Sequence, residues 1–360
     1  MTKHGRVKYY FRRFFVLLLS LVIFFLFSCS MDIGDYAKMS SMEMIQSLTK
    51  NTKNARITVG IVQDGNMAFT VYGENGRTLP GTEYNYDLGS ISKAITGHLF
   101  AKAIYEDLIT LDDLDISIDR FLDLPRKNYY PTIKRLLTHT SGYKYQYAYY
   151  MPPKQAPFEN PFYGITREMT IHHIKGINLE NKDYPFGYSN FGLSVAGIVL
   201  EKIFNQEYTS LVNRYFQDLE LNNTRVGNGK GNLKYHYIWN SDNSYIAAAG
   251  IVSTVTDLMK FAQMYIDETL PYAEYAGRIW AKDLNTDFKY PELGNNTDAM
   301  GLGWHIDTGN NIIWHGGALD TFCTYMGFDK DEEIAVVVLS NIRSRVPAWI
   351  IGSQIFKELR

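Results

Sequence analysis

The two ends of the chain carry one kind of pattern and the middle carries another. β-rich runs lie at 57–62 and 67–72 around a Gly-containing turn, which is typical of a hairpin. Four more β-rich runs lie towards the C-terminus, at 303–306, 312–314, 321–328 and 334–339. Helical patterns and loops dominate the middle, from about 110 to 290. The sequence therefore predicts an α+β fold, in which both chain ends build one antiparallel sheet flanked by helices and a mostly helical subdomain is inserted.

Apolar residues at helical spacing predict the helices. They recur every four positions from Ile91 to Ala103, which indicates a helix with one buried face from Ser90 to about Glu106. Thr254 and Asp257 fit a capping box at the start of another helix. The remaining helices are expected at 40–49, 133–137, 192–204, 208–216, 256–265 and 346–357.

The N-terminus has the pattern of an export signal. Basic residues precede an apolar run from Phe14 to Phe27, and this run is shorter than the ~20 residues that cross a bilayer. A signal peptide at 1–28 is therefore favoured over a permanent transmembrane helix. Residues 26–29 resemble a bacterial lipobox, in which Cys29 receives a lipid and becomes the mature N-terminus. We expect an exported lipoprotein, held at the membrane by Cys29 on a tether of residues 29–54 and facing the periplasm or the cell exterior.

Loss of the signal makes the chain more acidic. The full sequence has 36 basic and 38 acidic residues, a formal net charge of −2. Five basic residues and no acidic residue precede Cys29, so the mature net charge changes from −2 to −7. A chain this acidic is a poor candidate for binding nucleic acid. Only Cys323 would then remain as a thiol, which excludes an intrachain disulfide.

Three Ser-x-x-Lys tetrads occur, beginning at Ser47, Ser90 and Ser141. Only Ser90 follows a β-like run and a glycine and opens a strongly apolar helix. Residues three apart share a helix face, so the Lys93 amine can reach the Ser90 hydroxyl. Burial and the positive helix N-terminus both disfavour a protonated lysine, and a neutral Lys93 could accept the serine proton. The alternative is an N-cap serine with a solvated lysine one turn later.

Two further motifs follow in order, Tyr188-Ser189-Asn190 and His315-Gly316-Gly317. With the Ser90 tetrad they resemble the serine β-lactamase and penicillin-recognising superfamily, particularly its branch of class C β-lactamases, D-Ala-D-Ala carboxypeptidases and esterases. The resemblance covers about 55–343 and implies a β-lactamase/transpeptidase-like domain there, with 344–360 as a helix packed on the sheet. Other stretches that carry it are 86–93, the Leu-Leu-Thr-His-Thr-Ser-Gly stretch at 136–142, 187–192 and 250–258.

The resemblance implies a mechanism through an acyl-enzyme. Ser90 would attack the carbonyl carbon, while Lys93 and Tyr188 would share the general acid and base work in an order that the sequence leaves open. Asn190 would position the substrate and Lys93. No cofactor is implied.

The third motif would supply the facing strand. His315 would line it, and the backbone N–H of Ala318 would complete an oxyanion hole with that of Ser90. Gly316 and Gly317 fit this role because a substrate must lie close against the strand.

His315 stands where β-lactamases usually have lysine, a permanent cation suited to a carboxylate. An unperturbed histidine titrates near ~6.5, so activity on acidic peptides should rise as the pH falls through this value. We expect a serine hydrolase that acts on peptides ending in D-alanine or on related small amides and esters, with weak β-lactamase activity. The alternatives are a carboxylesterase with the same machinery and a catalytically silent binding protein of the same fold.

Other candidate sites are weaker. The aspartates at 112–119 lack the spacing of a calcium loop, and His139, His172 and His173 lack zinc spacing, so we expect no metal. Aromatic residues between Tyr143 and Tyr163 could rim the cleft or pack the helical subdomain. We expect a monomer whose partners are a small-molecule or peptide substrate and, through Cys29, the membrane.

Overall fold

The computed structural model describes residues 33–144, 160–270, 272–293, 295–342 and 348–360. The chain forms two compact units, residues 1–38 and 39–360. One helical turn of the first unit is described, α2 (Ile33–Tyr36). The expected signal at 1–28, Cys29 and the aromatic residues at 145–158 lie outside the described residues, so export and lipidation stay predictions. Within the described ranges, no helix is both long enough and apolar enough to span a bilayer.

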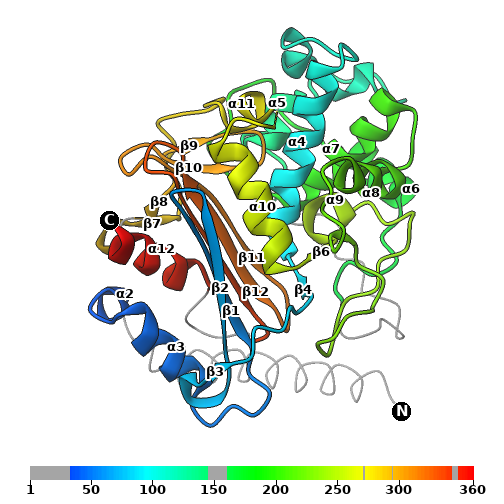
Figure 1. The fold of residues 1–360 in the computed structure, drawn as a ribbon. Helices are drawn as coiled ribbons and strands as arrows, with labels where there is room; N and C mark the ends of the chain where they lie inside the picture. The colour runs from blue at the N-terminus through cyan, green and yellow to red at the C-terminus, as the bar shows by residue number, and fades with distance from the viewer. Residues whose placement is uncertain (1–32, 145–159, 271, 294, 343–347) are drawn as a thin grey trace, which may run out of the picture. The chain divides into compact units, whose positions relative to one another are not determined.

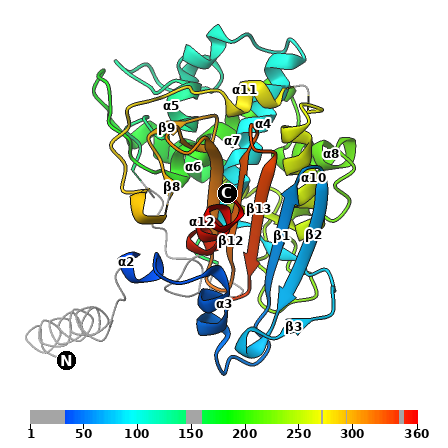
Figure 2. The same cartoon turned by 60° about the vertical axis from the view of Figure 1, so that its left-hand side comes forward.

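An eight-stranded antiparallel sheet forms the centre of the second unit (Figures 1 and 2). Its order is β3-β2-β1-β13-β12-β11-β10-β9, so the first long strand lies beside the last, with Ile57 opposite Ser340. This pairing confirms the predicted sheet built from both chain ends. The strands are β1 (Ile57–Gln63), β2 (Asn66–Tyr72), β3 (Thr78–Leu79), β9 (Ala299–Met300), β10 (His305–Asp307), β11 (Ile312–Ala318), β12 (Cys323–Asp329) and β13 (Ile334–Ser340).

Helices cover both faces of this sheet (Figure 1). On one face α12 (Ala348–Leu359) packs on β12 and β13, and on the other α10 (Val255–Ile266) packs on β1 and β13. α3 (Ser41–Thr49) lies beside α12, where the Ser41 hydroxyl donates to the Glu358 carboxylate at 2.6 Å. Every residue of β12 and β13 is buried. Two covered faces explain why these strands are nearly continuous apolar runs in the sequence.

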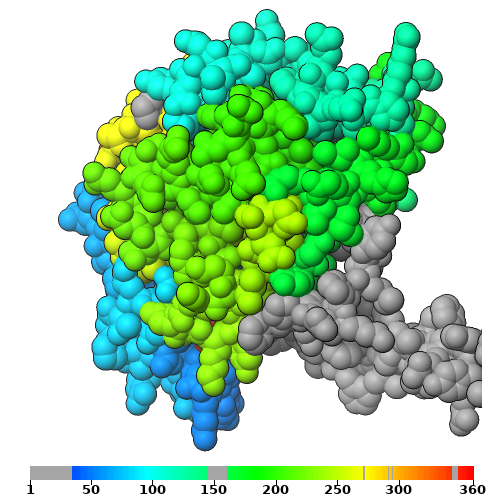
Figure 3. All heavy atoms as spheres, turned by 90° about the vertical axis from the view of Figure 1, so that its right-hand side faces the viewer, coloured from blue at the N-terminus to red at the C-terminus, as the bar shows by residue number. Residues whose placement is uncertain are grey.

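The middle of the chain forms the predicted helical subdomain, and Figure 3 shows the face that it presents. A small sheet in the order β4-β6-β5 joins this part to the nucleophile segment, and β7 and β8 form a separate pair. The helices are α4 (Ser92–Tyr105), α5 (Ile133–Leu137), α6 (Arg167–Gly176), α7 (Asn190–Phe204), α8 (Tyr208–Asp218), α9 (Ile246–Ala249) and α11 (Ala273–Gly277). The short strands are β4 (Tyr86–Asp87), β5 (Arg225–Val226), β6 (Ile251–Ser253), β7 (Lys289–Tyr290) and β8 (Asn295–Asn296).

Two local expectations differ from the structure. α4 was expected to bury one face, but 12 of its 14 residues are buried, because α7, α9 and α11 all pack against it. At the start of α10, Thr254 Oγ1 accepts from the Asp257 N–H at 3.4 Å, which is half of the predicted capping box. The Asp257 carboxylate instead accepts from the Asn223 N–H at 2.8 Å and from the Thr224 hydroxyl at 2.7 Å. It therefore ties α10 to a distant loop.

Candidate active site

Ser90 and Lys93 lie at the junction between β4 and α4. Ser90 stands in a single 3-10 turn, Gly89–Ile91, and is half-buried, whereas Lys93 is fully buried in the first turn of α4. Lys93 Nζ lies 2.9 Å from Ser90 Oγ and 2.8 Å from the Ala248 carbonyl oxygen, to which it donates. The nucleophile and base that the sequence predicts are therefore in direct contact.

Two glycines hold α4 in this position. A Cβ atom at Gly97 would lie 1.7 Å from the Leu302 carbonyl oxygen, and one at Gly303 would lie 2.3 Å from the Lys93 carbonyl oxygen. Gly303 also has a φ of +74°, which disfavours any other residue. The backbone of α4 thus lies directly against the segment that leads into β10. This contact fixes the helix that carries Lys93.

The surroundings of Lys93 favour its neutral form. Burial lowers the pKa of its ammonium group well below the usual range. Nζ lies 5.0 Å from the centre of the Tyr188 ring, and no ion pair to Lys93 forms within the described part of the chain. A neutral amine at 2.9 Å from a serine hydroxyl can accept its proton.

Tyr188 is positioned by His139. The rings of these residues are 4.5 Å apart, and His139 Nδ1 accepts from the Ser189 N–H at 3.1 Å. The His139 carbonyl also accepts from the Gly187 N–H at 2.8 Å. His139 has a φ of +58°, an uncommon conformation for a histidine, and is 1% exposed. Its contacts with residues on both sides of Tyr188 give this histidine a structural role.

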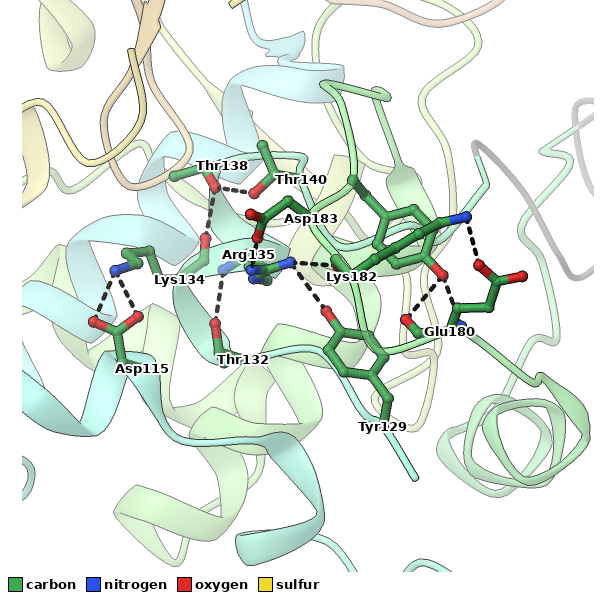
Figure 4. A network of polar contacts seen from close by, with 11 residues as sticks. Asp115, Tyr129, Thr132, Lys134, Arg135, Thr138, Thr140, Glu180, Lys182 and Asp183 are labelled. Carbon is green, nitrogen blue, oxygen red and sulfur yellow. Dashed lines mark hydrogen bonds and ion pairs between the residues drawn. The ribbon is translucent and has the colours of Figure 1, made fainter. Parts of the chain in front are cut away.

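Figure 4 shows the polar network that supports this segment. Arg135 of α5 forms an ion pair with Asp183 and donates to the Lys182 carbonyl at 3.0 Å. Just after α5, the Thr138 hydroxyl donates to the Lys134 carbonyl and contacts the Thr140 hydroxyl at 2.9 Å. α5 therefore anchors both the segment that carries His139 and the segment that leads to Tyr188.

His315 and His305 lie on neighbouring strands of the sheet with their rings 4.7 Å apart. His315 Nδ1 lies 2.7 Å from the Gly316 carbonyl oxygen, while His305 Nδ1 lies 3.1 Å from Thr297 Oγ1. Burial, then the nearby His305 and Lys93, lower the pKa of His315 well below its usual range. The expected titration of His315 near ~6.5 is therefore wrong. At neutral pH His315 offers a neutral ring, and no rise in activity through protonation of His315 is expected between pH 8 and 6.

The end of β11 lies against the nucleophile turn. A Cβ atom at Gly89 would be 3.1 Å from the Ala318 backbone nitrogen, so the two predicted oxyanion segments are neighbours. A Cβ atom at Gly317 would lie 1.9 Å from the Leu88 carbonyl oxygen. Gly317 is thus required by packing between the strand and the nucleophile segment, whereas the sequence suggested close approach of a substrate.

Asn190 is the first residue of α7 and is 5% exposed. Its Oδ1 is buried and has no hydrogen-bond partner in the part of the chain that the structure describes. The predicted contact with Lys93 is not among the hydrogen bonds of these residues. Asn190 follows Tyr188 by two residues and is not hydrogen-bonded to Lys93 within the described part of the chain.

A pocket of about 410 Å³ opens at Ser90. It brings together Ser90, Tyr188, His315, Gly316, Gly317 and Ala318, all of which the sequence predicted as site residues. The sequence did not predict the rest of the lining. These residues are Phe186, Gly187, Asn285, Asp287, Phe288, His305, Trp314, Cys323 and Trp349.

Comparison with known proteins places this arrangement in a family. The family model described as Beta-lactamase matches residues 43–351. The chain belongs to the β-lactamase family. This confirms the resemblance drawn from the sequence motifs.

Relatives of this β-lactamase-family chain are distant. It is 22% identical to "Protein flp" of Staphylococcus aureus over an alignment of 302 residues that covers 76% of this chain and 57% of that protein. The chain thus spans little more than half the length of the curated relatives it matches. An octameric penicillin-binding protein homologue from Pyrococcus abyssi has a TM-score of 0.66 at 20% identity, with 89% of this chain and 75% of that chain covered.

A "Beta-lactamase/D-alanine Carboxypeptidase" from Yersinia pestis has a TM-score of 0.68 at 16% identity, with 92% of this chain and all of that chain covered. At these identities the two solved structures show that the fold is shared, which confirms the predicted α+β class.

The other two Ser-x-x-Lys tetrads of this β-lactamase-family chain lack the geometry of the first. Ser47 is exposed in α3, with Lys50 exposed just after it. Ser141 is buried, and its hydroxyl accepts from the Tyr143 N–H at 3.2 Å. Neither serine is hydrogen-bonded to the lysine of its tetrad among the described contacts. The context that singled out Ser90 in the sequence thus corresponds to a real structural difference.

Buried histidines should make this β-lactamase-family fold sensitive to acid. Burial lowers the pKa of His98 to about 3, and burial and Lys93 lower that of His305 to about 3. The unfolded chain takes up these protons near pH 6.5. The contribution of the two neutral histidines to the free energy of unfolding is therefore fully present above that pH and falls as the pH decreases towards 3. Each histidine should contribute a slope of up to about 1.4 kcal/mol per pH unit.

Urea unfolding at pH 7.5, 6.5, 5.5 and 4.5 measures this slope. The His98 ring is fully buried beside Trp304 Nε1. His98→Gln should therefore reduce the slope by up to about 1.4 kcal/mol per pH unit, the contribution of one proton, whatever it does to the free energy of unfolding at pH 7.5. An unchanged slope in His98→Gln would show that His98 is not a source of the acid sensitivity.

Proposed function

We propose that this chain is a serine hydrolase that works through an acyl-enzyme on Ser90. Ser90 Oγ bonds to the carbonyl carbon of an amide or ester as its proton passes to Lys93 or Tyr188. The tetrahedral oxyanion would be stabilised by the N–H groups of Ser90 and Ala318. The leaving group takes the proton as its bond to carbon breaks, and water then hydrolyses the acyl-serine. The observation that carries this proposal is the 2.9 Å contact between Ser90 Oγ and the fully buried amine of Lys93.

Small amides and esters, including peptides that end in D-alanine, are the proposed substrates. A specific observation favours the ester and neutral-amide side of this range, which keeps carboxylesterase as the second candidate. The described residues that line the pocket include no lysine or arginine, and burial favours the neutral form of His315 by lowering its pKa. A carboxylate at the end of a peptide would thus meet no cation on the lining described.

Active-site labelling tests the proposal. The intact protein is treated separately with a fluorescent fluorophosphonate and a fluorescent penicillin, and the modified residue is mapped by peptide mass spectrometry. We expect the fluorophosphonate on Ser90 and little penicillin labelling. If a folded sample carries neither label on Ser90, the chain is better explained as a catalytically silent binding protein of this fold.

His315→Lys separates the two substrate classes. The longer side chain would place an ammonium in the pocket, so the rate of acylation by penicillin should rise relative to that by a neutral ester. The expected change in this ratio is about fivefold, the scale of an ion pair worth ~1 kcal/mol. Both rates must be measured on the same preparation, since damaged packing would lower them together. An unchanged ratio would mean that position 315 does not meet a carboxylate, which favours the carboxylesterase.

A further inference from the structure

The mouth of the Ser90 pocket has an unusual balance of charge. Asp287 is the one carboxylate among the residues that line the pocket, and no lysine or arginine lines it in the described structure. Asp287 is exposed and makes no ion pair with another described residue. Lys289 is close in sequence, but it is exposed, donates to Asn285 Oδ1 at 3.3 Å and does not line the pocket. The charge on the described residues that line the pocket therefore favours a cation over an anion.

Aromatic rings line the same pocket as this carboxylate. Phe186 and Phe288 line the mouth with ring centres 6.4 Å apart in an edge-to-face arrangement. Trp349 lines the pocket from the first turn of α12, and its ring centre lies 4.3 Å from that of Tyr290 in a tilted arrangement. Asp287 lies three residues before Tyr290 and lines the same pocket as Trp349. Aromatic faces beside a carboxylate are a suitable site for an ammonium group.

Trp349 also connects this cluster to the reacting atoms. A Cβ atom at Gly316 would lie 3.4 Å from Trp349 Cδ1, so the indole lies directly beside the strand that leads to Ala318. Trp349 and Asp287 both line the pocket that opens at Ser90, so a substrate whose carbonyl lies at Ser90 shares the pocket with both side chains.

We propose that the pocket selects substrates that carry a protonated amine on an aromatic or aliphatic group, and that Asp287 and Trp349 recognise this amine. This inference rests on the proposed hydrolase function, because it names a substrate class for the same site. Amides and esters of amine-bearing acids are then preferred over equivalent compounds that carry a carboxylate.

Binding to the Ser90→Ala protein tests the selection without turnover. Three ligands share one skeleton: 3-phenylpropylamine, the neutral 3-phenylpropanamide and 3-phenylpropanoate. Binding is followed by the fluorescence of Trp314 and Trp349, which line the pocket. We expect the amine to bind at least about fivefold more tightly than the carboxylate at low salt, with the difference shrinking at high salt.

Asp287→Asn in the same background should weaken amine binding by about threefold to fivefold and leave amide binding unchanged. Trp349→Leu should weaken amine binding by a further factor of about two to five. Asp283→Asn is the matched control, because Asp283 is an exposed aspartate of the same segment that does not line the pocket. Its φ of +56° suits asparagine, so the variant should fold normally.

Three results would overturn the inference. These are tighter binding of the carboxylate, no binding of the amine, or an equal effect of Asp283→Asn and Asp287→Asn. Failure of the hydrolase proposal is a separate result, since it would appear as absence of Ser90 labelling while the amine preference in Ser90→Ala persists. Thermal unfolding of each variant shows whether a change in binding reflects loss of the fold.

Discussion

Ser90→Ala is expected to abolish covalent labelling by the fluorophosphonate, because it removes the oxygen that would form the new bond. The side chain is half-buried at a pocket wall and makes one short contact, with Lys93 Nζ at 2.9 Å. Its loss should therefore leave the fold intact, and thermal unfolding should change little. Gel fluorescence and mass spectrometry measure the result.

Ser47→Ala and Ser141→Ala are the controls for this experiment. Both serines begin a Ser-x-x-Lys tetrad, yet Ser47 is exposed on α3 and Ser141 is buried away from its lysine. Each variant should keep wild-type labelling. Labelling retained in Ser90→Ala, or lost in either control while that protein remains folded, would refute the assignment of the nucleophile.

Lys93→Ala and Tyr188→Phe should each lower the rate of acylation by roughly a hundredfold or more, the usual scale of a general acid or base. Lys93 supplies the neutral amine that contacts Ser90 Oγ. Tyr188→Phe removes a hydroxyl and keeps the ring that packs at 4.5 Å on His139. The measurement is the rate constant of fluorophosphonate labelling under pseudo-first-order conditions.

Lys93→Met serves as the control for packing, since it fills most of the lysine volume without a basic nitrogen. Lys93→Met and Lys93→Ala should be slow to a similar extent if the missing base is the cause. A labelling rate of Lys93→Met within threefold of wild type would show that Lys93 is not the general base. The same result for Tyr188→Phe would show that the Tyr188 hydroxyl is not needed for acylation.

The sheet and the longer helices could be predicted because their burial is visible in local sequence. β13 is buried throughout, so Ile334 to Leu339 is a continuous apolar run. α5 was expected at 133–137 and occupies those residues. β11 extends four residues beyond its expected end at Trp314, through the two glycines of the third motif, because β12 pairs with it along that length. No local pattern marks such pairing.

One helix and the strand pairing of the small sheet escaped prediction. α6 buries only Thr170 and Ile174, so it shows no apolar stripe. The strands of the small β4-β6-β5 sheet have two or three residues each. The pairing of β4 with β6 joins segments more than a hundred residues apart in the chain, as between Tyr86 and Ser253.

The residues of the candidate site likewise fall into those that the sequence could predict and those that it could not. Ser90, Lys93 and Tyr188 lie in motifs whose spacing is itself informative. His305 and Asp287 have no such signal, because His305 reaches the pocket through sheet order and Asp287 through the loop between α11 and β7. The lowered pKa of His315 could not be predicted from the sequence either, because it depends on burial beside His305 and Lys93.

The close approach of α4 to the segment before β10 has a consequence for laboratory evolution of this protein. Any side chain at Gly97 or Gly303 would displace the helix that carries Lys93, so mutations at either position should be eliminated in any selection for activity. Asn285 and Asp287 are exposed, by contrast, and can change without moving that helix. Libraries for new substrate ranges should therefore randomise the loop at 285–287 and keep both glycines constant.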